Sequence, residues 1–125
     1  ASTGKLIVCG NISQNKAHDD AEFNVKGTIS FEEGANQTIS GKGTGNQIKF
    51  FNGSLLVLKK KAVDNTVTFN NKVTTENGLN TQLKVDLTRG TLNFAEGTTE
   101  LNIGDSKRKY IYIPKDVTLA ANNGA

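Results

Sequence analysis

The sequence predicts an all-β fold, and three observations lead to that prediction. From Gly27 to the C-terminus, runs of three to six β-forming residues alternate with turns built on Gly or Asn. Asn, Thr and Gly together make up about a third of the chain, which favours many short strands over a few long elements. No segment carries apolar residues at helical spacing over three turns, because Gly and β-branched residues interrupt every window.

Most of the runs alternate apolar with polar residues, so each strand is expected to bury one face and expose the other. The single proline, Pro114, is expected to end the strand before it or to mark a sheet edge. The predicted strands of the repetitive part cover residues 28–31, 38–40, 47–50, 55–58, 66–69, 72–75, 83–87, 91–94, 99–103, 110–113 and 117–119.

The spacing of these strands favours a β-solenoid. Every second strand start, at 28, 47, 66, 83, 99 and 117, follows the previous one by 16 to 19 residues, which is typical of stacked coils. A Thr-apolar-x-Phe pattern recurs at 28–31, 66–69 and 91–94, with its Phe in register. A β-sandwich or jelly roll remains the alternative, because these folds also place turns every 8 to 12 residues.

The chain of 125 residues has the length of a single domain with a modest core. Residues 1–26 are irregular and contain one strand candidate at 5–9, followed by a polar stretch, whereas residues 27–125 form the repetitive β region. The alternation resumes at Glu22, with Phe23 and Val25 on one side of the strand.

Composition limits the classes of partner. The net charge of +3 and the pI of about 9.0 come from basic and acidic residues that are interspersed, so the sequence does not predict nucleic-acid binding. No run of apolar residues is long enough to span a membrane as a helix. A chain that lacks Met and opens at Ala1 is expected to be a processed form or a fragment, which favours a secreted or cell-surface protein.

The sequence predicts neither an enzyme nor a cofactor or metal site. Cys9 is the only cysteine, so no intramolecular disulfide can form, and we expect it to be a small buried apolar residue, with an intermolecular disulfide as the alternative. A nucleophile would need a base, and the only histidine is His18, in a polar, turn-like stretch. The acidic pairs at 19–20 and 32–33 are expected to be solvated surface, with a Ca²⁺ site as the alternative.

One candidate ligand site lies near the C-terminus. If residues 110–113 form a strand with Ile111 and Ile113 in the core, alternation places Arg108, Tyr110 and Tyr112 together on the outer face. A row of exposed Arg and Tyr side chains can stack on sugar rings or contact anionic polymers. The alternative is an edge strand whose basic residues discourage aggregation.

A second candidate is an assembly strand formed by Leu6, Ile7, Val8 and Cys9. It could cap the first coil of a solenoid, or it could leave its own domain and pair with the open edge of a neighbour, joining subunits into a fibre. An ordinary strand within the chain is the other possibility.

The residues at 67–80, which begin Val-Thr-Phe-Asn-Asn, and those at 90–104 resemble bacterial surface β-helices. The resemblance is to autotransporter passenger domains and secreted adhesins, and it covers residues 28–121. It implies a right-handed β-helix on a bacterial surface that adheres or self-associates without performing chemistry. The cysteine departs from this family's usual composition, and the resemblance transfers no site residue.

These observations predict a non-enzymatic, secreted or surface-exposed structural or adhesive module that self-assembles into fibres through strand addition. Its expected partners are a second copy, or a glycan or protein of a host or cell surface. The alternative is a β-sandwich carbohydrate-binding module that uses Arg108, Tyr110 and Tyr112.

Overall fold

The computed structural model describes residues 4–14, 22–41, 46–95 and 100–121, and it is a β-solenoid of about four turns. Its only helical element among these residues is the 3-10 turn η1 (Gly78–Asn80). The strands are β1 (Lys5–Val8), β2 (Ile12–Gln14), β3 (Glu22–Val25), β4 (Thr28–Glu33), β5 (Gln37–Gly41), β6 (Gln47–Phe50), β7 (Leu55–Lys60), β8 (Thr66–Phe69), β9 (Lys72–Thr75), β10 (Leu83–Phe94), β11 (Ile103–Asp105) and β12 (Val117–Ala121).

The strands line three faces of the solenoid. The first face contains β1, β4, β7, the first half of β10, and β11; the second contains β2, β5, β8, the second half of β10, and β12. The third contains β3, β6 and β9. Every pair of neighbouring strands among the described residues is parallel. The solenoid prediction is therefore confirmed, and the sandwich alternative, which needs antiparallel sheets, is wrong.

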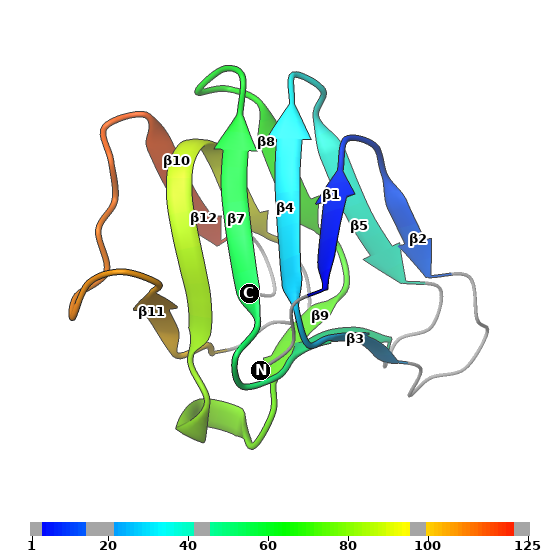
Figure 1. Ribbon diagram of the computed structural model, residues 1–125. Coiled ribbons are helices and arrows are strands. Elements are labelled where there is room, and N and C mark those ends of the chain that lie inside the picture. The colour runs from blue at the N-terminus through cyan, green and yellow to red at the C-terminus, as the bar shows by residue number, and fades with distance from the viewer. Residues whose placement is uncertain (1–3, 15–21, 42–45, 96–99, 122–125) are drawn as a thin grey trace.

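The three faces surround one core and give the chain a right-handed path. Figure 1 shows the first face in front with its strands rising, the second face behind with its strands descending, and β3 and β9 below. The chain advances to the left from β1 to β10 as it winds, so the turn is right-handed, as parallel crossovers almost always are.

The coils are longer than the sequence spacing predicted. Ile29 pairs with Leu56, a step of 27 residues, and Leu56 pairs with Val85, a step of 29. On the third face Phe23 pairs with Ile48, a step of 25. The predicted step of 16 to 19 residues is wrong because it assumed two strands per coil, whereas a complete coil has three.

Like residues stack along the core from coil to coil. Ile29, Leu56 and Val85 form one interior row, and all three are buried. Ile12, Ile39, Phe69 and Phe94 form another row on the second face. Each row adds apolar area to the core at the same position in successive coils, so the hydrophobic effect and the backbone ladder favour one register.

The aromatic pattern is confirmed in part. Phe69 and Phe94 occupy equivalent positions in successive coils and stack with ring centroids 5.7 Å apart. Phe31 lies on the first face instead, and its ring packs against that of Phe69 across the core in a T-shaped arrangement, with the ring centroids 5.9 Å apart. The repeated pattern therefore marks core positions on two different faces.

Strand β10 serves two faces because it bends without a loop. Its register shifts between Leu87 and Arg89, and Gly90 has a φ of 118°. A Cβ at Gly90 would lie 2.6 Å from Cγ of Lys60 and 3.2 Å from the carbonyl oxygen of Asn65. Both the backbone conformation and the close packing therefore require Gly at this corner.

We expect Phe69→Ala to lower the free energy of unfolding by about 3–5 kcal/mol, because it removes a fully buried ring that contacts Phe31 and Phe94. Urea unfolding followed by circular dichroism measures this loss. Val63→Ala is the control, because Val63 is 50% exposed and its truncation should change stability by less than about 0.5 kcal/mol. Equal losses for the two variants would contradict the assigned core.

Candidate functional site

Three features could carry function, and they lie at the ends and at one corner of the solenoid. The first, the N-terminal edge, is the outer side of β1 with its residues Leu6, Ile7 and Val8. The second, the corner pair, is Gln37 and Lys60 between the first and second faces. The third, the C-terminal loop, is residues 106–116 between β11 and β12.

The N-terminal edge leaves apolar side chains uncovered. Leu6 faces the interior above Ile29, yet 48% of it is exposed because no further coil of the described residues covers it. Ile7 faces outward beside Ser30 and is 53% exposed, whereas Val8 is buried next to Phe31. The prediction of a strand here is confirmed for Leu6, Ile7 and Val8.

Cys9 differs from its prediction. It follows the last residue of β1, lies in a bend and is exposed, so it is not the buried apolar residue expected from the sequence. The physical reason is the end of pairing: the ladder of β1 with β4 stops at Val8, and the chain turns there towards β2.

The outer side of β1 offers backbone groups for a further strand. The amide of Thr28 donates to the carbonyl of Gly4 at 2.8 Å, so Gly4 directs its polar groups towards β4. The backbone N–H and C=O groups of successive strand residues point to alternate sides. Those of Leu6 and Val8 therefore also point towards β4, whereas those of Ile7 point to the open side. A cavity of about 250 Å³ opens at the same end, between the start of β1 and β3, and reaches Leu6 and Phe23.

The corner pair joins three coils through buried polar groups. Gln37 occupies an interior position in line with Val67 and Leu92, and its amide nitrogen donates to the carbonyls of Val8 (2.9 Å) and Gly10 (2.8 Å). Its amide oxygen accepts a short hydrogen bond from Nζ of Lys60. The ammonium group also donates to the carbonyl of Glu32 at 2.8 Å.

Burial lowers the pKa of Lys60, and the nearby charges of Cys9 and Glu33 oppose that change. The folded protein therefore holds this proton less tightly than the unfolded chain does, and its stability rises as the pH increases towards the usual lysine value of 10.5. The hydrogen bonds to Gln37 and Glu32 hold the ammonium group in place, so this lysine has a structural role.

The C-terminal loop is not the strand that the sequence predicted. Residues 110–113 have no strand partner in the part of the chain that the structure describes, and Tyr110, Ile111, Tyr112 and Ile113 are 66%, 41%, 46% and 44% exposed. The prediction that Ile111 and Ile113 lie in the core is therefore wrong, whereas both tyrosines are exposed as expected. The alternating pattern was present, but β11 stops at Asp105 and no strand follows it until β12.

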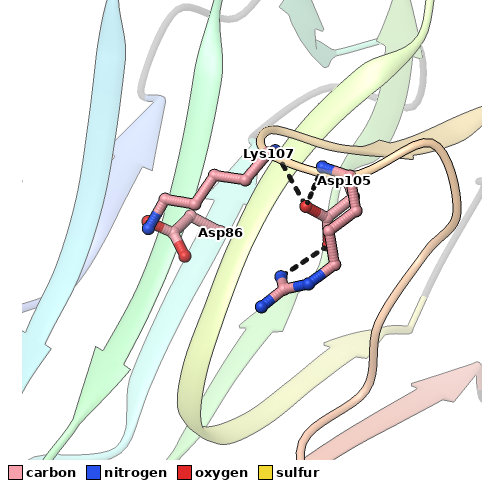
Figure 2. Close-up of polar contacts among 4 residues, drawn as sticks. Asp86, Asp105 and Lys107 are labelled. Atoms are coloured by element: carbon pink, nitrogen blue, oxygen red, sulfur yellow. Dashed lines mark hydrogen bonds and ion pairs between the residues drawn. The ribbon is translucent and has the colours of Figure 1, made fainter.

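Asp105 ends β11 and organises the loop. It pairs with Val85, so it takes the interior position at the end of the row of Ile29, Leu56 and Val85. Its Oδ1 accepts hydrogen bonds from the amides of Lys107 (2.8 Å) and Arg108 (3.0 Å) (Figure 2). A charged side chain in a core row stops the stacking of apolar residues and turns the chain outward.

Backbone hydrogen bonds lower the pKa of Asp105. The largest contribution comes from the amide of Lys107, burial opposes it, and the amides of Arg108 and Tyr112 and the Arg108 charge add to the lowering. A carboxylate that accepts from the amides of Lys107 and Arg108 fixes the start of the loop.

Two ion pairs attach the basic residues of the loop to the body of the protein. Arg108 approaches Oδ2 of Asp105 at 3.5 Å, and Nζ of Lys107 lies 3.4 Å from Oδ2 of Asp86 on β10 (Figure 2). The guanidinium group of Arg108 also lies over the ring of Tyr112, 4.4 Å from its centroid. Of the three predicted ligand-binding residues, Arg108 and Tyr112 are thus in contact, but they do not form a row on a strand.

No group of three or more potential metal ligands occurs among residues 4–14, 22–41, 46–95 and 100–121. Glu32 and Glu33 diverge, since Glu32 accepts from the hydroxyl of Ser30 and Glu33 pairs with Lys61 at 3.1 Å. His18, the only histidine that could have served as a base for Cys9, and the acidic pair at 19–20 lie outside the described residues. None of the helical residues described is part of a helix that could cross a membrane.

Comparison of the chain with protein-family models, with curated proteins and with solved structures finds no match. The class of protein is therefore defined by its fold, a parallel β-solenoid, and the resemblance to bacterial surface β-helices stays a prediction.

Sequence reasoning missed Asp105, Gln37 and Lys60. A signal existed for Asp105, because alternation from Ile103 places it on the interior side, where a carboxylate is unusual. A similar signal existed for Gln37, two residues before the buried Ile39 on the same strand. Lys60 carried none, since it stands in a run of three lysines that suggests a solvated surface.

We expect Lys60→Met to lower the free energy of unfolding by about 1–3 kcal/mol, because it removes the donor to the buried amide oxygen of Gln37 and to the partly buried backbone carbonyl of Glu32. Lys61→Met is the matched control on the next residue, whose side chain is 72% exposed and makes only a surface ion pair. Chemical denaturation of both variants measures the difference. A neutral Lys60→Met variant would show that the corner pair does not stabilise the stack.

Acid should loosen the C-terminal loop. Because the folded pKa of Asp105 lies below its usual value of 3.8, the carboxylate stabilises the loop above that value, and the stabilisation is lost as the pH falls through the folded pKa. Tyr110 and Tyr112 are the only tyrosines and the chain has no Trp, so tyrosine fluorescence anisotropy reports on this loop alone. We expect the anisotropy to fall in acid.

At pH 7 Asp105→Ala should lower the anisotropy in the same way, whereas Asp86→Ala, which removes only the surface partner of Lys107, should change it little. An Asp105→Ala protein with the anisotropy of the unmodified chain would contradict the organising role of this carboxylate.

Proposed function

We propose that the protein is a non-enzymatic structural and adhesive module, secreted or exposed at a cell surface, that self-associates by strand addition at its N-terminal edge. The observation that carries the proposal is β1: an ordered strand that, among the described residues, is paired on one side only, with exposed apolar residues and backbone groups directed to the open side.

A second copy is the partner with the best fit. Interior residues at the N-terminal edge, among them Leu6 and Phe23, need apolar residues to cover them. The open backbone groups of β1 need a parallel or antiparallel strand at the usual strand spacing. The end of another solenoid supplies both at once. A globular partner without an open sheet edge would leave the amide and carbonyl of Ile7 unpaired, which is costly for buried groups.

The two ends of the solenoid are not equivalent. At the C-terminal end, the carboxylate of Asp105 occupies an interior position and disfavours the addition of a further strand to the first face. On the second face, β12 has no strand on its outer side among the described residues. Two copies can join their N-terminal edges to give a closed dimer, and fibres need β12 to accept a strand of the next copy as well. The closed dimer is therefore the first product that we expect, with fibres at higher concentration.

The carbohydrate-binding alternative has less support. Its sandwich fold is wrong for this chain, and Arg108, Tyr110 and Tyr112 lie on a loop instead of forming a flat row on a strand. One face of the Tyr112 ring is already covered by Arg108, so that face cannot stack on a sugar.

Ile7→Pro tests the proposal. Proline removes an N–H that points to the open side, suits an extended backbone, and leaves the hydrogen bonds of β1 with β4 intact. We expect it to weaken self-association at least about tenfold in sedimentation velocity experiments. Ile7→Ala is the matched control, since it removes the side chain but keeps the N–H and should weaken association less.

Unmodified protein that stays monomeric throughout the concentration series would contradict the proposal. The same would follow if Ile7→Pro weakened association no more than Ile7→Ala does, because the contact would then depend on the side chain and not on strand addition.

A further inference from the structure

The C-terminal loop holds four consecutive exposed apolar or aromatic residues, Tyr110, Ile111, Tyr112 and Ile113. The remaining exposed large apolar residues among the described ranges are the edge residues Leu6 and Ile7 and the isolated Val63 and Leu79. The four loop residues are therefore a continuous run of exposed apolar and aromatic side chains in the sequence, which neither the core nor the N-terminal edge accounts for.

Basic residues surround this apolar surface on both sides in the sequence. Lys107, Arg108 and Lys109 precede it, Lys115 follows it, and all four are exposed. Residues 106–115 contain no acidic residue, and the two that flank them are engaged: Asp105 is buried and holds the loop, and Asp116 lies 3.8 Å from Arg89. The loop thus combines an uncovered apolar segment with net positive charge.

The loop is organised before any partner binds. Asp105 accepts hydrogen bonds from the amides of Lys107 and Arg108, and the guanidinium group of Arg108 lies over the ring of Tyr112. A loop held in one conformation loses little conformational entropy on binding, so its exposed side chains can contribute their transfer free energy to the complex.

We propose that the C-terminal loop docks on the surface of an anionic lipid bilayer. Tyr110, Ile111, Tyr112 and Ile113 would insert at the boundary of headgroups and acyl chains, where Tyr is favoured and aliphatic side chains leave water. Lys109 and Lys115, which have no ion-pair partner among the described residues, would face the anionic headgroups. This inference concerns the opposite end of the solenoid from the assembly edge and does not depend on self-association.

An anionic polysaccharide would also attract the basic residues, but it would not use the aliphatic ones. Ile111 and Ile113 are 41% and 44% exposed and have no polar atom to offer a sugar, whereas a bilayer interface buries such side chains. The contact of Arg108 with one face of the Tyr112 ring also disfavours a sugar partner, because that face cannot stack on a sugar. The aliphatic pair is therefore the feature that separates the two partners experimentally.

Sedimentation with vesicles tests the proposal with two lipid compositions, phosphatidylcholine alone and phosphatidylcholine mixed with phosphatidylserine. We expect binding to the mixed vesicles, weaker binding as salt is raised, and little binding to the neutral ones. The double variant Ile111→Ser/Ile113→Ser should bind the mixed vesicles at least about tenfold more weakly, because it removes the favourable free energy of transferring two aliphatic side chains from water to the bilayer interface.

The charge contribution is measured with Lys109→Gln and Lys115→Gln, because neither lysine has an ion-pair partner among the described residues. Each change should weaken binding to the mixed vesicles about fivefold. Val63→Ser/Leu79→Ser is the matched control, with side chains that are 50% and 49% exposed elsewhere on the surface, and it should bind as the unmodified protein does.

Circular dichroism of each variant establishes that it is folded. Three results would overturn the proposal: no binding to the mixed vesicles, equal loss in the control and the Ile111/Ile113 variants, or binding to heparin without binding to vesicles. The last result would assign the loop to an anionic polysaccharide.

Discussion

The parallel hydrogen-bond ladder between successive coils is the constraint on which the rest of the structure depends. It requires each coil to place its strands directly above those of the coil before, and the apolar rows, such as Ile29, Leu56 and Val85, follow from that stacking. The ladder also explains the polar corner, because Gln37 and Lys60 bring donors to carbonyls of the neighbouring coils. Each coil is stabilised chiefly by its neighbours, as in other repeat architectures.

The first and last coils of the described residues differ in how their ladders stop. At the C-terminal end a carboxylate, Asp105, takes an apolar position, and the chain leaves the first face as a loop. At the N-terminal end no charged residue takes an interior position on β1, and Leu6 stays half exposed. Both proposed interactions arise from these ends, strand addition where the ladder is open and lipid docking where the chain leaves it.

Much of the fold could be predicted from local sequence, because strand periodicity and turn residues are local properties. The strands at 28–31, 47–50 and 66–69 were expected close to where they occur. The coil length could not be predicted, since the number of strands per coil depends on which segments pair, a long-range property. The exposure of Ile111 and Ile113 was missed for the same reason: alternation describes a strand only if a neighbouring strand pairs with it, and β11 ends at Asp105 before that segment.

The most direct test of the stacked-coil arrangement is a set of nuclear Overhauser contacts between backbone protons in solution. The structure predicts parallel-strand contacts between Ile29 and Leu56, between Leu56 and Val85, and between Ile39 and Phe69. These pairs are far apart in the sequence and meet only if the coils stack. Short Hα–Hα contacts between sequential strands such as β4 and β5, the sign of antiparallel pairing, would contradict the solenoid and every inference drawn from its ends.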